Sequence, residues 1–176
     1  MRTPLATVSG FAKTLTRQAE LADPAARYVE MIEAAAAQIA ELVDELALVA
    51  RIESDRYEPT LRAADTLALA RSAAKRLGEE RVHVEGDGAA LDTDVEAAER
   101  AVAALAQCAL RHGGLDEVRV VAREEIEIAP ITPASAPVVL GEDLRDLGAA
   151  VAVKLVRALG GSVALNGETL RVRLGA

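Results

Sequence analysis

The side chains in this sequence best suited to act as nucleophiles or metal ligands are one cysteine, Cys108, and two histidines, His83 and His112. His83 alternates with apolar residues in a predicted strand, and His112 closes a predicted helix, where a cation suits the helix dipole. We therefore interpret both as structural.

The cysteine and the composition limit the class of protein. A single cysteine excludes an internal disulfide framework, and we interpret Cys108 as a small buried residue on the inner face of a helix. The chain has 176 residues and 51% apolar content, enough for a core, but only 2% aromatics. A net charge of −8 argues against nucleic acid or an anionic membrane as the main partner. No apolar run approaches the roughly 20 residues of a membrane span, so we expect a cytoplasmic protein without membrane contact.

Two helices with matching apolar periodicity are predicted at the start of the chain. The longer covers residues 24–53, with Asp23 as N-cap and Pro24 in the first helical position. Its apolar residues recur at alternating steps of four and three, which is typical of helix–helix packing. They are Tyr28, Ile32, Ala35, Ile39, Leu42, Leu46 and Val49. The first helix has the same spacing at Leu5, Val8, Ala12, Leu15 and Ala19.

A short turn over residues 20–24 makes these helices an antiparallel hairpin. A lone hairpin would leave half of each apolar stripe in water, so we predict a homodimer in which two hairpins form a four-helix bundle. The first helix can begin no earlier than about Thr3, and the second is longer by roughly ten residues. Leu46 and Val49 are therefore expected to lack a partner within the hairpin.

The rest of the chain predicts shorter, mixed elements. Helices are expected over residues 66–77, 94–112 and about 144–159, the first capped by Asp65 and stopped by Gly78. Strands are expected over 81–84, 117–122, 126–129, 162–165 and 169–174, with a proline-containing loop over 130–139. Asn166-Gly167 is the strongest hairpin signal. The fold class is α+β: a helical hairpin followed by a two-layer α/β sandwich with a mostly antiparallel sheet.

The N-terminal residues carry a specific resemblance. Arg2-Thr3-Pro4-Leu5, followed by Val8-Ser9-Gly10-Phe11, resembles the segment after the phospho-accepting histidine in bacterial two-component sensor histidine kinases. In that alignment the histidine would lie two residues upstream of this chain. Residues 51–54 resemble the end of the family's second dimerisation helix. The resemblance implies a dimerisation and phosphotransfer-like hairpin over residues 1–57 and a degenerate ATPase-like domain over residues 58–176.

The nucleotide site of that family is where this sequence departs. Aligned with the family's Asn-x-x-x-Asn helix, Ala104 and Cys108 replace both asparagines, and neither a methyl group nor a thiol suits Mg²⁺. No Asp-x-Gly-x-Gly pattern occurs between residues 126 and 139. The later glycine loop resembles Asp146-Leu147-Gly148-Ala149, which keeps one glycine and adds a negative charge. We therefore expect no nucleotide cofactor, no metal and no autokinase activity.

Two functional hypotheses follow from the resemblance. The first is a dimer that docks response-regulator receiver domains or another histidine kinase, as a phosphotransferase-like or scaffold module without ATP binding. The second is an N-terminally truncated catalytic core of an ATP-dependent sensor histidine kinase. In the first, the family's docking face maps to Thr7, Phe11, Thr14 and Gln18 on the first helix. Phe11 is its expected anchor, although an inward orientation into the bundle is an open alternative.

Overall fold

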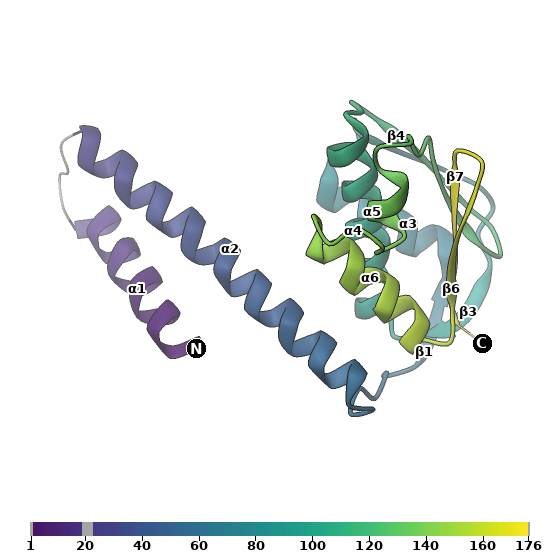
Figure 1. The fold of residues 1–176 in the computed structure, drawn as a ribbon, viewed down its shortest axis with the longest axis horizontal. Helices are drawn as coiled ribbons and strands as arrows, with labels where there is room; N and C mark the ends of the chain where they lie inside the picture. The colour runs from purple at the N-terminus through teal and green to yellow at the C-terminus, as the bar shows by residue number, and fades with distance from the viewer. Residues whose placement is uncertain (1, 19–22, 176) are drawn as a thin grey trace. The chain divides into compact units, whose positions relative to one another are not determined.

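The protein is described by a computed structural model that covers residues 2–18 and 23–175 (Figure 1). The chain divides into two compact units, Met1–Ala50 and Arg51–Ala176. Within the described residues, no helix combines the length and the apolar character needed to cross a membrane.

The first unit is a pair of helices, α1 (Arg2–Gln18) and α2 (Asp23–Glu53), the latter ending just inside the second unit. Both predicted helices are confirmed, and α1 begins one residue before the expected limit. The helices are antiparallel, since Thr16 near the end of α1 donates to Glu33 (Oγ1 to Oε1, 3.2 Å) while Leu5 lines a groove with Val43. The predicted turn lies largely outside the described residues, because residues 19–22 are not covered.

Small side chains form the contact between α1 and α2. Among the described residues of this unit, the buried apolar side chains are Ala12, Val29 and Ala36. The apolar stripe predicted on the second helix faces away from this contact: its large members are 46–64% exposed, namely Tyr28, Ile32, Ile39, Leu42 and Leu46. Alanines let the two backbones approach, but each buries little area. One hairpin therefore leaves most of its large apolar side chains uncovered.

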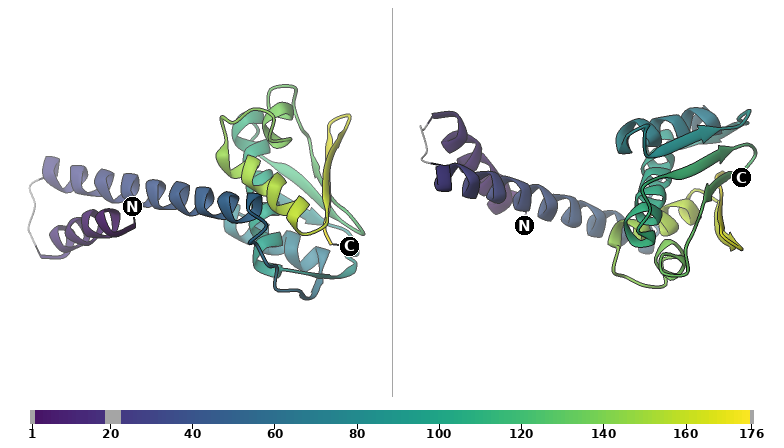
Figure 2. Two further views of the ribbon diagram at one scale, coloured as in Figure 1. Left: turned by 60° about the horizontal axis from the view of Figure 1, so that its bottom comes forward. Right: turned by 90° about the horizontal axis from the view of Figure 1, so that it is seen from above.

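The second unit contains a five-stranded sheet within residues 51–175, all of which are described (Figure 2). The strand order is β2-β4-β5-β7-β6, with only the β2–β4 pair parallel. The strands are β2 (Val82–Glu85), β4 (Val118–Ala122), β5 (Ile126–Ala129), β6 (Ser162–Asn166) and β7 (Thr169–Arg173). The mostly antiparallel sheet and the hairpin at Asn166-Gly167 are thus confirmed.

Helices α3 (Thr66–Leu77), α4 (Val95–Gly113) and α6 (Leu147–Ala158) form the second layer of the sandwich. Alternation along the strands separates the two faces of the sheet: Val118, Val120 and Ala122 are buried, while Arg119 is exposed. Cross-strand ion pairs such as Arg119–Glu85 (3.5 Å) occupy the solvent face. The core therefore lies between the helices and one face of the sheet, as in a two-layer fold.

Aspartates begin the three long helices of this unit. Asp65 accepts from the amides of Leu67 and Ala68, and Gly78 ends α3 with φ of +101°, as predicted. Asp94 caps α4 through Oδ1, while its Oδ2 accepts from Tyr57 Oη (3.3 Å) and Thr60 N (3.1 Å). The same carboxylate therefore starts α4 and fixes the segment that follows α2.

Several predicted boundaries need correction. The sequence missed a two-stranded antiparallel ribbon of β1 (Arg62–Asp65) and β3 (Ala90–Thr93), whose short strands lack alternating apolar residues. The predicted loop over 130–139 contains a short helix, α5 (Ala136–Val139). The last helix begins at Leu147 rather than near 144, because Asp146 serves as its cap. Strand β2 is shifted by one residue.

Candidate functional site

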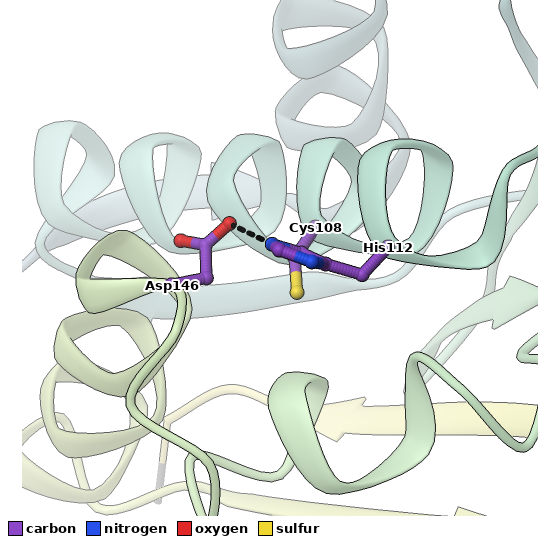
Figure 3. A group of neighbouring side chains, drawn as sticks. All are labelled: Cys108, His112 and Asp146. Atoms are coloured by element: carbon purple, nitrogen blue, oxygen red, sulfur yellow. Dashed lines mark hydrogen bonds and ion pairs between the residues drawn. The ribbon is translucent and has the colours of Figure 1, made fainter.

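Helix α4 and the start of α6 bring three polar side chains together: Cys108, His112 and Asp146 (Figure 3). Cys108 and His112 are one turn apart on α4 and so project from the same side of the helix. That helix runs from its Asp94 cap to Gly114, which ends it in the left-handed conformation (φ +63°). The contact between α4 and α6 is part of the helical layer, and it places Asp146 opposite the last turn of α4.

The carboxylate of Asp146 has two roles. Its Oδ1 accepts from the amide of Ala149 (3.0 Å) and so caps α6. Its Oδ2 lies 3.1 Å from Nε2 of His112 and 3.9 Å from Nη1 of Arg111. The side chains of His112 and Asp146 are only 19% and 12% exposed. Asp146 thus joins the end of one helix to the beginning of another in a sheltered environment.

Cys108 is the fully buried member of the group, with no exposed surface, which confirms its predicted burial. Burial raises the pKa of its thiol to about 12, and the negative charge of Asp146 acts in the same direction. At neutral pH the free side chain is therefore a thiol, and we do not assign it a role as a nucleophile.

The two remaining positions of the predicted degenerate site, Ala104 and Gly148, lie close in sequence to Cys108 and Asp146, respectively. Unlike Cys108, both are partly exposed. Ala104 is partly exposed, one turn before Cys108 on α4. Gly148 lies in the first turn of α6, within regular helix, and is partly exposed. The sequence singled out Cys108 and Asp146 separately but did not join His112 to them. The spacing of four between Cys108 and His112 on one helix was the available signal.

His83 belongs to a different pair. Its Nε2 lies 2.8 Å from Oε2 of Glu117, and the two side chains are 54% and 69% exposed. This is a surface contact between β2 and the residue just before β4, on the solvent side of the sheet edge.

The predicted docking residues lie on α1, at steps that place them on one side of the helix. Phe11 is 68% exposed, so in a single chain its ring points outward. Thr7 and Thr14 are also exposed, and Thr14 Oγ1 donates to the carbonyl of Gly10 (2.8 Å). The side chain of Gln18 lies outside the described residues.

Comparison with known proteins identifies the architecture. Residues 1–55 match the family described as the His Kinase A (phospho-acceptor) domain. No curated protein sequence matches the chain. The fold is similar to the Acinetobacter baumannii histidine kinase AdeS, with a TM-score of 0.62 and 14% identity over 99% of this chain and 97% of that one.

Two further structures extend the likeness. Full-length ShkA in complex with AMPPNP aligns with a TM-score of 0.73 and 20% identity, over 97% of this chain and 42% of that one. Histidine kinase ThkA, in complex with response regulator protein TrrA, aligns with a TM-score of 0.52 and 14% identity, over 97% of this chain and 56% of that one. The chain therefore shares the fold of these histidine kinase structures, a helical hairpin followed by an α/β sandwich, and its residues 1–55 match a histidine-kinase phospho-acceptor domain.

Proposed function

We propose that this chain is a histidine-kinase-like homodimer of two-component signal transduction that docks response-regulator receiver domains, as a phosphotransferase-like or scaffold module, without binding ATP. The main support for the absence of ATP binding is the position of Asp146 at the start of α6. The amide of Ala149, which a helix N-terminus could offer to a phosphate, already donates to this carboxylate.

Charge at the α6 start opposes a nucleotide. The carboxylate of Asp146 adds a negative charge where the resemblance places phosphate groups, and phosphates carry the same sign. Its contacts with His112 and Arg111 hold it in place. Gly148 belongs to regular helix, so no flexible glycine loop replaces the lost amide contacts.

The donor set on α4 also fails to fit a magnesium nucleotide. Mg²⁺ requires oxygen ligands in near-octahedral geometry. At the two aligned positions the chain offers the methyl group of Ala104 and the buried thiol of Cys108. These two positions therefore offer no ligand for the Mg²⁺ of a nucleotide complex.

A titration with a fluorescent ATP analogue in the presence of Mg²⁺ tests this part of the proposal. We expect no saturable binding in the micromolar range. The matched variant is Asp146→Ser, which keeps a helix cap but removes the charge. Any residual binding should increase in that variant. Saturable micromolar binding by the unchanged chain, displaced by unlabelled ATP, would contradict the proposal.

One observation favours the alternative function, the catalytic core of an ATP-dependent sensor histidine kinase. ShkA, which has a similar fold, was solved in complex with AMPPNP. In that case the nucleotide would be held by residues other than Ala104, Cys108 and Asp146. The same titration separates the two functions, because the alternative requires saturable binding.

The proposed homodimer is supported by the exposed apolar stripe on α2. Its large side chains are uncovered in one hairpin, and their regular spacing matches the packing of a second helix. A second copy of the same hairpin presents the same stripe, as a two-fold symmetric interface needs.

The proposed docking face is supported by the exposure of Phe11, Thr7 and Thr14 on α1. Exposed aromatic side chains are frequent anchors at interfaces. The complex of ThkA with its response regulator provides a precedent among proteins of this fold for receiver docking.

The substitution Phe11→Ala tests this face. We expect it to weaken binding of the chain's receiver-domain partner, found by screening response regulators from the same genome, more than it lowers the melting temperature. Leu15→Ala is the matched control on the same helix, because Leu15 is also exposed (46%) but belongs to the apolar spacing of the first helix and not to the docking face. A large loss of stability with unchanged receiver binding would reverse the assignment of Phe11.

A further inference from the structure

We propose that Cys108, His112 and Asp146 form a binding site for one Zn²⁺ ion between the last turns of α4 and the start of α6. The three side chains meet in the fold although Asp146 is distant from the other two in sequence. One thiol sulfur, one imidazole nitrogen and one carboxylate oxygen all lie within 4.8 Å of one another. This inference departs from the sequence-based expectation of no metal, and it does not depend on the proposed docking function.

The ligand types are those of zinc sites. Zn²⁺ is bound by cysteine sulfur, histidine nitrogen and carboxylate oxygen, usually in tetrahedral geometry. Cys108 and His112, four residues apart on one helix, provide two ligands on the same side. Mg²⁺ disfavours this set because sulfur and nitrogen are poor ligands for it. The proposal is therefore for a borderline transition metal and not for the metal of a nucleotide complex.

The distances are close to those needed. Metal–ligand bonds of about 2.0–2.3 Å place ligands of a tetrahedral ion about 3.5 Å apart. His112 Nε2 and Asp146 Oδ2 are already 3.1 Å apart. The sulfur lies within 4.8 Å of one ring nitrogen of His112 and one carboxylate oxygen of Asp146, somewhat beyond the spacing of a bound ion's ligands, so the side chains would have to close around the ion.

The hydrogen bonding orients the candidate ligands, and a bound ion would replace the direct contact between His112 Nε2 and Asp146 Oδ2. Asp146 caps α6 with Oδ1, which fixes the carboxylate plane while Oδ2 points at His112 (Figure 3). Cys108 is buried and the other two side chains are only slightly exposed, so the site opens to solvent on the side of His112 and Asp146. Three protein ligands leave the fourth position for a water molecule or an external ligand.

The charges around the site balance. A thiolate and a carboxylate neutralise Zn²⁺, with the thiol proton released to solvent on binding. Arg111 lies 3.9 Å from Asp146, but its side chain is 64% exposed, so solvent screens the repulsion between its guanidinium and the bound Zn²⁺. The nearby Arg145 is paired with Asp143 at 2.8 Å. Because the ligands come from two elements, the bound ion would join α4 to the start of α6.

Cobalt titration of the full chain provides a direct test. The protein is stripped of metal with a chelator, desalted and titrated with Co²⁺, whose bond to a thiolate gives a charge-transfer absorption in the near ultraviolet. We expect one Co²⁺ per chain, with this absorption, and displacement by Zn²⁺. The chain has one cysteine, so the absorption reports on Cys108 alone. We also expect Zn²⁺, but not Mg²⁺, to raise the melting temperature.

Four variants assign the ligands. Cys108→Ala should abolish the charge-transfer band, and it suits a helix that is already rich in buried alanines. His112→Asn and Asp146→Ser should each lower affinity at least about tenfold, and the serine still caps α6. His83→Ala removes the only other imidazole and should change nothing. Absence of the absorption in the unchanged chain, or equal Co²⁺ affinity in the unchanged chain and Asp146→Ser, would overturn the site.

Discussion

The two units of this chain differ in how far they bury their apolar side chains. In the hairpin, the buried apolar residues among those described are Ala12, Val29 and Ala36, while larger side chains on α2 are exposed. In the sandwich, large residues such as Leu105, Ile128 and Leu170 are fully buried between helices and sheet. The second unit therefore completes its core within one chain, whereas the first has a surface suited to a second helical hairpin.

This difference has a thermodynamic consequence. Stability gained by burying side chains within a chain does not depend on protein concentration, but stability gained at an interface between copies does. The sandwich should therefore unfold at one temperature at any dilution. The hairpin should lose structure on dilution if its stripe is covered by a second copy.

The largest expected effect comes from a charge in the stripe. Ile39→Glu keeps a good helix former but places a carboxylate in each half of the proposed dimer interface, near the two-fold related stripe. Losing the remaining burial of two half-exposed isoleucines and removing two carboxylates from water should together cost about 3–6 kcal/mol per dimer and weaken association more than about 100-fold. Sedimentation equilibrium measures the dissociation constant of the dimer. Leu144→Glu, at an exposed leucine of the sandwich (70% exposed, against 50% for Ile39), is the control, and an equal effect there would remove the distinction between the units.

A cavity in the sandwich should give the next largest effect, and this effect should not depend on protein concentration. Leu105 on α4 has no exposed surface. Leu105→Ala should cost about 3 kcal/mol of unfolding free energy, by lost burial and a cavity. Urea unfolding followed by circular dichroism at two protein concentrations should give the same loss at both. A concentration-dependent loss would mean that the sandwich also depends on association.

Removing the cap of α4 should have a smaller effect. Asp94→Ala deletes the cap and the acceptor for Tyr57 and Thr60, at a cost of about 2 kcal/mol for the second unit. Asp87→Ala, at an exposed aspartate of the same unit, is the comparison. Thermal unfolding monitors both variants. Equal melting temperatures would mean that Asp94 contributes nothing beyond an ordinary surface aspartate.

The smallest effect concerns alkaline pH. Burial raises the pKa of Tyr57 to about 12, and the charge of Asp94 and its hydrogen bond add to the shift. Arg51, whose guanidinium lies 5.9 Å from the ring centre, opposes it, and Glu96 reinforces it. Because the folded state holds the phenol proton more tightly, this contribution to stability is complete below the ordinary pKa of 10 and is lost as pH rises toward 12.

Tyr57→Phe isolates that contribution, since it keeps the ring and removes the hydroxyl. We expect the variant to lose less stability than the unchanged chain between pH 10 and 12, as measured by urea unfolding at several pH values. Parallel pH curves for the two proteins would contradict the raised pKa.

Some features of the candidate site could be predicted from the local sequence, and others required the tertiary structure. That Cys108 is buried followed from its place on the inner face of a predicted helix, and the structure confirms it. The charge added by Asp146 was also visible in the sequence. That His112 meets Asp146 was not, because the two residues come from different helices and only the packing of α4 on α6 brings them within 3.1 Å.

The sequence by itself determined the long helices, the β6–β7 hairpin and the caps Asp65 and Gly78, because periodicity, capping and turn chemistry act within a few residues of the chain. The tertiary structure decided where α6 begins, that the short β1 and β3 pair, and which face of α2 contacts α1. Those outcomes depend on contacts between segments distant in sequence. Local patterns limit such contacts without selecting among them.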